Sequence, residues 1–181
     1  MTDLTDLQGT YVLDPSHTQI GFVVRHAMVA KVRGSFDEYT GTATIDGSNP
    51  ENSSLEVVVQ AASVNTRSED RDAHLRSADF FDAETYPTIT FVATGFAVNG
   101  DTVEVTGDFT IRDVTKSLTI PFEFQGGATD PFGNQRIGFE GQVQVNRSEY
   151  GLTWNAALET GGFMVSDKVI LEFEVSAIKQ A

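Results

Sequence analysis

Residues 136–147 read RIGFEGQVQVNR, and this stretch decides the fold. Apolar residues recur at every second position, namely Ile137, Phe139, Val143 and Val145, while charged and amide side chains mostly fill the alternate positions. Successive side chains of a β-strand point to opposite faces of a sheet, so this period indicates a strand with one buried face and one solvent-exposed face. A strand over 135–147 would span about 43 Å, which is long for a globular protein.

The same alternation, bounded by turn residues, recurs along the chain and predicts eight antiparallel strands. We place them at 10–26 (broken at Asp14-Pro15), 34–46, 54–64, 88–98, 102–112, 117–125, 135–147 and 168–178. Only the connection between the third and fourth strands is long, which favours an all-β fold with a single eight-stranded antiparallel up-and-down barrel. Closure would remove two long strand edges that invite aggregation. A two-sheet sandwich fits the same pattern.

Composition narrows the class of protein. The 181 residues include 40% hydrophobic residues with a mean hydropathy of −0.16, which is typical of a soluble globular chain. We expect one barrel domain at 10–181 after a flexible N-terminus at 1–9. The chain contains no cysteine, so disulfides and Cys-ligated metals are excluded. The net charge of −14 disfavours nucleic acid and anionic membranes as partners. The acidic N-terminus resembles no signal peptide, and no apolar run suits a transmembrane segment, so we expect a cytoplasmic location.

Small residues interrupt the large apolar ones on the predicted strands. They are Gly21, Gly41, Ala43, Ala61, Ala93, Gly107 and Gly141. In an eight-stranded barrel, such residues indicate either a deep, narrow apolar slot or a filled core with glycines at bulges. The pattern leaves both interpretations open.

Alternate strands of a meander run the same way, so four of the predicted connections meet at one rim. Ten of the twelve Lys and Arg residues lie on or beside that rim: Arg25, Lys31, Arg33, Arg67, Arg71, Arg76, Arg112, Lys116, Arg147 and Lys168. Carboxylates crowd the same loops, so the rim is close to neutral and the remaining surface is acidic. His26 and Arg147 continue the inward rows of their strands, so they would either hold a ligand head group or bind nearby carbonyls and acids.

The long connection contains RSEDRDAHLRSADFF at 67–81, the densest charged stretch of the chain. Ser68 suits a helix N-cap, so we predict a short helix within 68–78. It would cover the open end of the barrel at that rim, with Leu75, Phe80 and Phe81 facing the barrel. In one interpretation the helix is merely solvated, with i,i+4 pairs Asp70–His74 and Asp72–Arg76. In the other, His74 and an arginine reach a ligand. No HxH or HExxH spacing and no nucleophile elbow supports a metal or a serine-hydrolase site.

Five blocks of the chain together resemble the YceI-like family. In order they are DPSHTQIGFVVRHAMVAKVRGSF, NTRSEDRDAHLRSADFFDAETYPTITF, GDFTIRDVTKSLTIPFEF, VNRSEYGL and VSDKVILEFEV. The resemblance covers residues 10–178, and RDxHLRSxxFFD followed by YPTITF is its most specific part. The residues that match the family pattern are Asp14, His17, Arg25, His26, Gly34, Arg71, Asp72, His74, Phe80, Phe81, Pro87, Phe91 and Arg147. The chain departs from the family in lacking a secretion signal and in having Asp113 where glycine is common.

The resemblance implies a lipocalin-like barrel that binds or carries a lipid rather than performing a reaction. The expected ligand is a long-chain isoprenoid lipid, of polyprenyl phosphate or isoprenoid quinone type, held for carriage, storage or sequestration, with no cofactor required. We expect His26, Arg71, His74 and Arg147 to bind its head group. We expect its tail to contact Ile20, Phe22, Val24, Phe36, Val57, Val59, Phe80, Phe81, Phe91, Phe109, Ile111, Phe122, Phe139, Val143, Leu171 and Phe173.

Two other functions remain open on the sequence. One is an enzyme that acts on a lipid head group through His26 or His74 acid–base chemistry. The other is a haem-binding barrel in which one of these histidines is an axial ligand. No nucleic-acid partner is expected, and a homodimer is possible.

Overall fold

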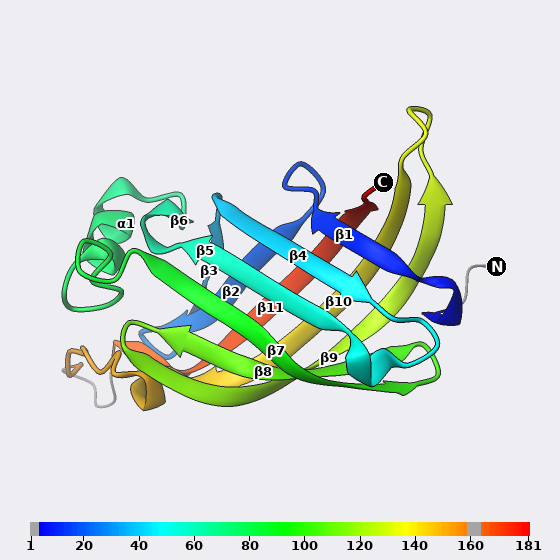
Figure 1. The fold of residues 1–181 in the computed structure, drawn as a ribbon. Coiled ribbons are helices and arrows are strands. Elements are labelled where there is room, and N and C mark those ends of the chain that lie inside the picture. The colour runs from blue at the N-terminus through cyan, green and yellow to red at the C-terminus, as the bar shows by residue number, and fades with distance from the viewer. Residues whose placement is uncertain (1–3, 159–163) are drawn as a thin grey trace.

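The last strand of the chain closes the sheet on itself. In the computed structural model, which describes residues 4–158 and 164–181, β11 (Val165–Lys179) pairs with β10 (Gln135–Asn146) along one edge. Its other edge pairs with β2 (Gln19–His26) and with β1 (Gly9–Leu13). All strand pairs are antiparallel, and Figure 1 shows them wrapping around one interior. The predicted closed barrel is confirmed, and the sandwich alternative is wrong.

The barrel wall has eight strand positions, which we call staves. The described residues form eleven strands because three of the staves are each interrupted and consist of two strands. β1 and β2 form the first stave, β3 (Ala30–Phe36) and β4 (Tyr39–Ile45) the second, and β5 (Ser54–Gln60) and β6 (Val64–Asn65) the third. The next three staves are β7 (Thr88–Asn99), β8 (Thr102–Ile111) and β9 (Val114–Thr129). The short helical elements are η1 (Leu4–Asp6), η2 (Pro50–Asn52), η3 (Ala61–Ser63), α1 (Glu69–Arg76) and η4 (Arg147–Tyr150).

Most predicted strand boundaries hold, with three differences. β11 begins at Val165 rather than at residue 168, because its pairing with β2 extends to His26 opposite Val165. The second stave begins at Ala30 rather than at residue 34, because the turn after β2 is short and the ladder starts at His26 opposite Ala30. β9 is also longer than the predicted 117–125, because its ladder with β10 continues to Thr129 opposite Gln135. The resulting hairpin projects beyond the barrel wall at upper right in Figure 1.

Asp14 occupies the break between β1 and β2, where the sequence predicted one. Its Oδ2 accepts hydrogen bonds from Arg136 Nη1 at 2.6 Å and lies 2.7 Å from His17 Nδ1. Arg136 Nε also donates to Asp130 Oδ2 at 2.7 Å. The bond from Arg136, followed by those from Ser16 and His17, holds the pKa of Asp14 far below its ordinary range. This network ties the kink of the first stave to the projecting hairpin.

The N-terminal segment covers the end of the barrel that lies opposite α1 (Figure 1). Leu7 is 3% exposed and packs with Tyr11, Ile137 and Ala177. Gly47 donates its backbone N–H to Gln8 Oε1 at 3.0 Å, which fixes the segment against the connection that precedes η2. Leu7 thus packs into the barrel within the segment 1–9 that the sequence predicts to be flexible. That flexibility stays a prediction, and residues 1–3 lie outside the described part of the chain.

The opposite end carries the predicted rim, which we call the mouth. α1, η4 and the turns that follow β2 and β8 gather there (Figure 1). α1 confirms the predicted helix, and Ser68 caps it by accepting a hydrogen bond from the Arg71 backbone N–H at 3.4 Å. The turn between β8 and β9 accommodates Asp113 because Arg112, at φ 56°, takes the left-handed conformation instead.

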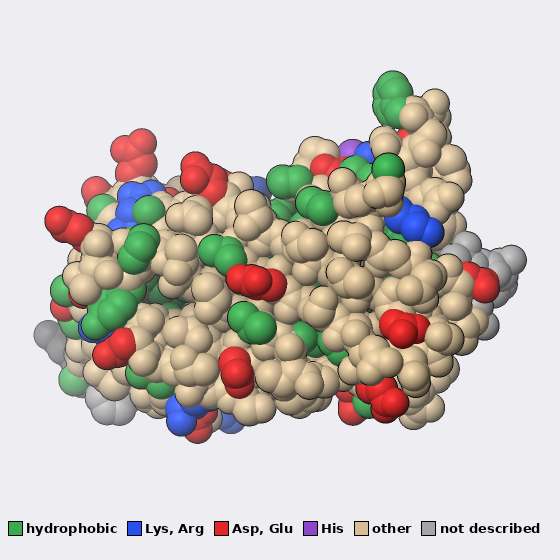
Figure 2. Space-filling model, viewed as in Figure 1, with side chains coloured by type: hydrophobic (Ala, Val, Ile, Leu, Met, Phe, Trp, Pro, Cys, Tyr) green, Lys and Arg blue, Asp and Glu red, His purple; other side chains and the backbone are tan. Residues whose placement is uncertain are grey.

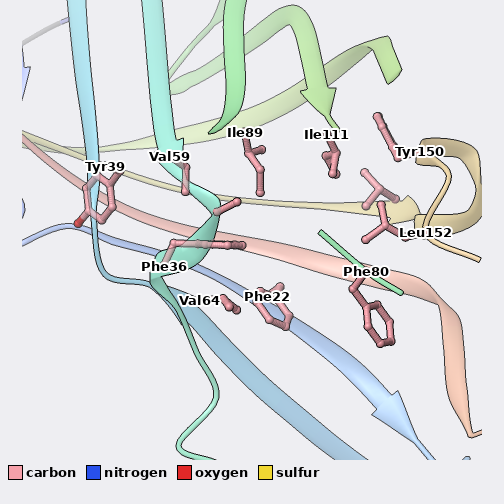
Figure 3. Packing of buried hydrophobic residues seen from close by; sticks show 12 residues of the cluster. Phe22, Phe36, Tyr39, Val59, Val64, Phe80, Ile89, Ile111, Tyr150 and Leu152 are labelled. Carbon is pink, nitrogen blue, oxygen red and sulfur yellow. The ribbon is translucent and has the colours of Figure 1, made fainter. Parts of the chain in front are cut away.

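Buried apolar residues form three separate clusters rather than one central core. The largest cluster lies under the mouth and includes Phe22, Phe36 and Phe80 (Figure 3). A second surrounds Leu7 at the far end, and a third, around Phe91, belongs to the wall. The barrel is therefore packed at its ends and along its wall.

We expect Arg136→Gln to lower the melting temperature at about pH 7 and to matter less at about pH 2.5. A carboxyl whose pKa is lower in the folded state than in the unfolded state stabilises the fold fully above its unfolded value of about 3.9. That contribution falls as pH drops toward the folded value, so the wild type loses its advantage in acid. Thermal unfolding followed by circular dichroism at the two pH values measures the difference.

Arg33→Gln is the matched control, because Arg33 and Glu172 form an ion pair with both side chains largely exposed. An Arg136→Gln variant that melts with the wild type at both pH values would contradict the role given to the network.

Candidate ligand-binding cavity

A cavity of about 430 Å³ runs through the barrel between its packed ends. At the far end it is lined by Leu4, Leu7 and Pro50, and at the mouth by His26, His74 and Trp154. Its wall between these ends is almost wholly apolar, since strand alternation directs the apolar rows inward. The slot interpretation of the sequence is therefore correct, and the filled-core interpretation is wrong.

Glycines on the strands make this space possible by letting large side chains lie flat on the wall. A Cβ built on Gly34 would lie 2.3 Å from Cζ of Phe22, whose ring covers it from the neighbouring strand. Phe91 covers Gly107 in the same way, with Cζ 2.6 Å from the position of the missing Cβ. A ring that lies along the wall in this manner leaves the centre of the barrel open.

Fifteen of the sixteen predicted tail-contacting residues line the cavity. They are Ile20, Phe22, Val24, Phe36, Val57, Val59, Phe80, Phe81, Phe91, Phe109, Ile111, Phe122, Phe139, Leu171 and Phe173. Val143 does not line it, because its side chain packs into the wall cluster of Phe91, Val105 and Ile120. The alternation placed Val143 on the face of that cluster, where it is partly buried.

α1 is held to the barrel by buried polar contacts rather than by the predicted pairs along its surface. Asp72 is 7% exposed, and its Oδ1 accepts from the backbone N–H and the hydroxyl of Thr66 at 2.8 and 2.6 Å. Arg71 Nε and Nη2 donate to the hydroxyl and carbonyl of the same residue. The i,i+4 pair of Asp72 with Arg76 is therefore wrong, because Asp72 turns inward to fix the loop before the helix.

His74 joins α1 to the connection between β10 and β11. Its ring stacks edge-on against Trp154, with centroids 4.6 Å apart, and against Phe80 at 5.0 Å. Nε2 lies 2.9 Å from Asp79 Oδ2, so the predicted partner Asp70 is replaced by a residue beyond the helix. His74 thus lies at the mouth with one ring nitrogen already engaged.

Arg147 is 8% exposed and binds backbone carbonyls instead of an acid. Nε donates to Ser166 at 2.8 Å, Nη1 to Leu152 and Trp154 at 2.7 and 2.9 Å, and Nη2 to Val165 at 3.2 Å. Burial lowers the pKa of its guanidinium, because the charged form is desolvated. Four of its five N–H groups are used in these bonds, so its main contacts fold the connection back over the mouth.

His26 and Arg71 have more hydrogen-bonding capacity left. The side chain of His26 makes no hydrogen bond to the described part of the chain, and Nη1 of Arg71 makes none there either. Both residues line the cavity, as do His74 and Arg147. The structure therefore brings the four predicted head-group residues to one end of one cavity.

Sequence reasoning missed the contribution of the segment that follows β10. Tyr150, Leu152 and Trp154 line the cavity, and the first two are buried at 3% and 5% exposure. Figure 3 shows Tyr150 and Leu152 directed toward the same interior as Ile111 and Phe80. Three large apolar residues within the five-residue stretch YGLTW were the available signal, because an exposed connection rarely carries so many.

Within residues 4–158 and 164–181, no group of three or more His, Asp or Glu side chains is arranged to hold a metal ion. No helix there combines the length and hydrophobicity needed to cross a membrane.

Comparison with known proteins places this barrel among relatives of the same length. The sequence model of the YceI-like domain family matches residues 11–177. A UPF0312 protein of Staphylococcus aureus strain USA300 is 36% identical over 170 residues, covering 92% of this chain and 95% of the relative.

Solved structures share the fold. The YCEI protein of Campylobacter jejuni has a TM-score of 0.74 at 32% identity and covers 93% of this chain and 97% of its own. BcnA of Burkholderia cenocepacia has a TM-score of 0.79 at 22% identity, covering 91% and 98%. A domain of Saccharophagus degradans described as polyisoprenoid binding has a TM-score of 0.72 at 20% identity, covering 94% and 98%.

We expect Gly34→Ala to destabilise the barrel by about 1–3 kcal/mol and to reduce the space in the cavity. The three atoms nearest to the new methyl group would all be ring atoms of Phe22. The ring must therefore leave the wall and enter the cavity. Urea unfolding and the binding of an apolar fluorescent dye measure the two effects.

Adding Phe22→Leu should restore stability, because the smaller side chain clears the methyl group. Gly95→Ala is the control, since no atom lies within 4 Å of a Cβ built there. Unchanged stability and dye binding in Gly34→Ala would show that the ring does not depend on the glycine.

Proposed function

Because this chain belongs to the YceI-like domain family, we propose that it binds one long-chain isoprenoid lipid inside the barrel. The ligand is of the polyprenyl phosphate or isoprenoid quinone type, and the protein carries, stores or sequesters it. No further cofactor takes part. Binding, rather than chemical conversion of the lipid, is the activity.

The observation that carries this proposal is the division of the cavity into an apolar length and a polar end. Apolar side chains line most of its length, with Asp46, Ser53 and Ser54 beside Pro50 at the far end, whereas Arg71 and Arg147 lie at the mouth together with His26 and His74. A hydrocarbon tail gains about 0.8 kcal/mol for each CH₂ removed from water, so such a wall supplies affinity without specific polar contacts. An isoprenoid lipid has the same division into a long apolar chain and a single polar head.

The structural neighbour from Saccharophagus degradans supports the class of ligand. It is described as a polyisoprenoid binding domain, and its fold covers 94% of this chain at 20% identity. At that identity the likeness concerns the fold, so the ligand is proposed here on the cavity and the family together.

Within the mouth, His26 and Arg71 are the best-placed residues to bind the head group. The His26 ring and Nη1 of Arg71 are uncommitted within the described chain, so both can donate to a phosphate or a quinone oxygen. His74 and Arg147 also line the mouth but already hold other contacts. They position the helix and the loop between which the head group would lie.

Organic extraction of the purified protein, followed by mass spectrometry, tests the proposal. We expect an isoprenoid lipid close to one molecule per chain. Recovery of fatty-acyl lipids alone, or of no lipid after incubation with a polyprenyl phosphate and a quinone, would contradict it. A haem absorption band would favour the haem-binding alternative, and a chemically altered head group would favour the enzyme.

We expect His26→Ala to weaken retention of the lipid by about tenfold while leaving the fold intact, because it removes one charge-assisted hydrogen bond at the mouth. His17→Ala is the matched control: His17 pairs with Asp14 at 2.7 Å and does not line the cavity. Retention is measured by competition with a fluorescent isoprenoid. Equal retention by the wild type and His26→Ala would remove His26 from the head-group site.

A further inference from the structure

The turn between β2 and β3 presents apolar side chains to solvent at the mouth. Met28 is 64% exposed and Val29 is 78% exposed. Ala27 and Met28 adopt left-handed backbone conformations, with φ of 52° and 64°, which makes the turn tight and its tip prominent. Two adjacent apolar residues this exposed are unusual unless a surface receives them.

The same hairpin lies in the longest acid-free stretch of an acidic protein. Between Asp14 and Asp37 the sequence contains no Asp or Glu, but it contains Arg25, Lys31 and Arg33. The chain as a whole has 26 acidic and 12 basic residues. We call residues 25–33 the mouth hairpin. Its three cations and lack of carboxylates give it a charge of +3 against a total of −14.

Two of the three cations of the mouth hairpin, Arg25 and Lys31, lie beside its apolar tip and are weakly engaged, whereas Arg33 pairs with Glu172 at 3.2 Å. Arg25 and Lys31 are direct cross-strand partners, two residues back from the turn. Arg25 Nη1 reaches only the carbonyl of Val29 at 3.5 Å, and Lys31 has no ion-pair partner in the described chain. Like charges held opposite each other destabilise a hairpin, so an external anion would relieve their repulsion.

The mouth hairpin also adjoins the cavity. Arg25 and His26 line the cavity, His26 pairs with Val165, and the Ala27 backbone N–H donates to the carbonyl of Met164 at 2.6 Å. A surface that received the tip would therefore lie next to the mouth. α1 offers no such contact, because its first turn carries Glu69 and Asp70.

We propose that the mouth hairpin docks onto an anionic lipid bilayer. Met28 and Val29 enter the interface between head groups and acyl chains, while Arg25 and Lys31 contact lipid phosphates. The net charge of −14 repels such a membrane at long range, so docking orients the protein with its basic hairpin toward the lipid. The proposal extends the proposed function, since it places the mouth where a lipid could be exchanged, but its test does not depend on the cargo.

Phe132 provides a matched control at the other end of the molecule. It is 87% exposed at the tip of the β9–β10 hairpin, whose hydrophobic tip projects at upper right in Figure 2. Its neighbour Asp130 is an acid that receives the Phe132 backbone N–H at 2.8 Å. Carboxylates are spread over the face in Figure 2, so an apolar tip alone does not suit an anionic surface.

Co-sedimentation of the purified protein with vesicles tests the proposal. We expect binding to vesicles of phosphatidylcholine and phosphatidylglycerol, weaker binding to phosphatidylcholine alone, and release at about 0.5 M salt. Met28→Ser with Val29→Ser should weaken binding at least about tenfold, and Arg25→Gln with Lys31→Gln should do the same. Phe132→Ser should bind like the wild type.

Absence of wild-type binding to the anionic vesicles would overturn the proposal, as would equal loss in Phe132→Ser. Binding that is indifferent to phosphatidylglycerol would also overturn it, because the cations would then play no part. Extraction of bound lipid from the same variants is a separate measurement. A protein that retains its isoprenoid but ignores vesicles refutes docking alone, whereas one that binds vesicles but retains no isoprenoid refutes the proposed function alone.

Discussion

The hollow interior depends on a steric fit between aromatic rings and the glycines beside them. Phe22 over Gly34 and Phe91 over Gly107 lie along the wall because no Cβ occupies the facing position. The ten phenylalanines that line the cavity would fill it if they were directed at the axis of the barrel. The position of the rings also explains why the buried residues divide into clusters at the ends and in the wall, with the cavity between them.

A hollow barrel forgoes packing in its centre, so its ends and connections supply stability that a filled core would give. At the mouth, Asp72 and Arg147 satisfy their charges on Thr66 and on backbone carbonyls, and so fix α1 and η4 in place. At the far end, the hydrogen bonds of Arg136 and the burial of Leu7 stabilise the hairpin and the N-terminal segment. Buried polar groups with such partners specify one arrangement of the loops.

The sequence was sufficient for the strands, their order and the inward rows, because strand alternation depends only on local spacing. It located α1 through Ser68, and fifteen of the sixteen residues predicted to contact a lipid tail line the cavity. It failed where partners lie outside the helix: Asp72 binds Thr66, six residues earlier, while His74 contacts Asp79, five residues later, and the distant Trp154. Val143 does not line the cavity although its strand phase directs it inward, because the surroundings of a single side chain depend on neighbours from other strands.

The position of Leu7 at the far end of the cavity has a consequence for how the proposed lipid would enter the barrel. Leu4 and Leu7 line the far end of the cavity, whereas the proposed head-group residues line the mouth. A lipid bound as proposed, with its head group at the mouth, would enter tail first and leave head first, so its polar group would be the last part to arrive and the first to depart. A membrane or protein that delivers or receives the lipid could therefore hold its head group while most of the lipid tail is still inside the barrel. The lipid would then pass directly from one to the other without being released into water.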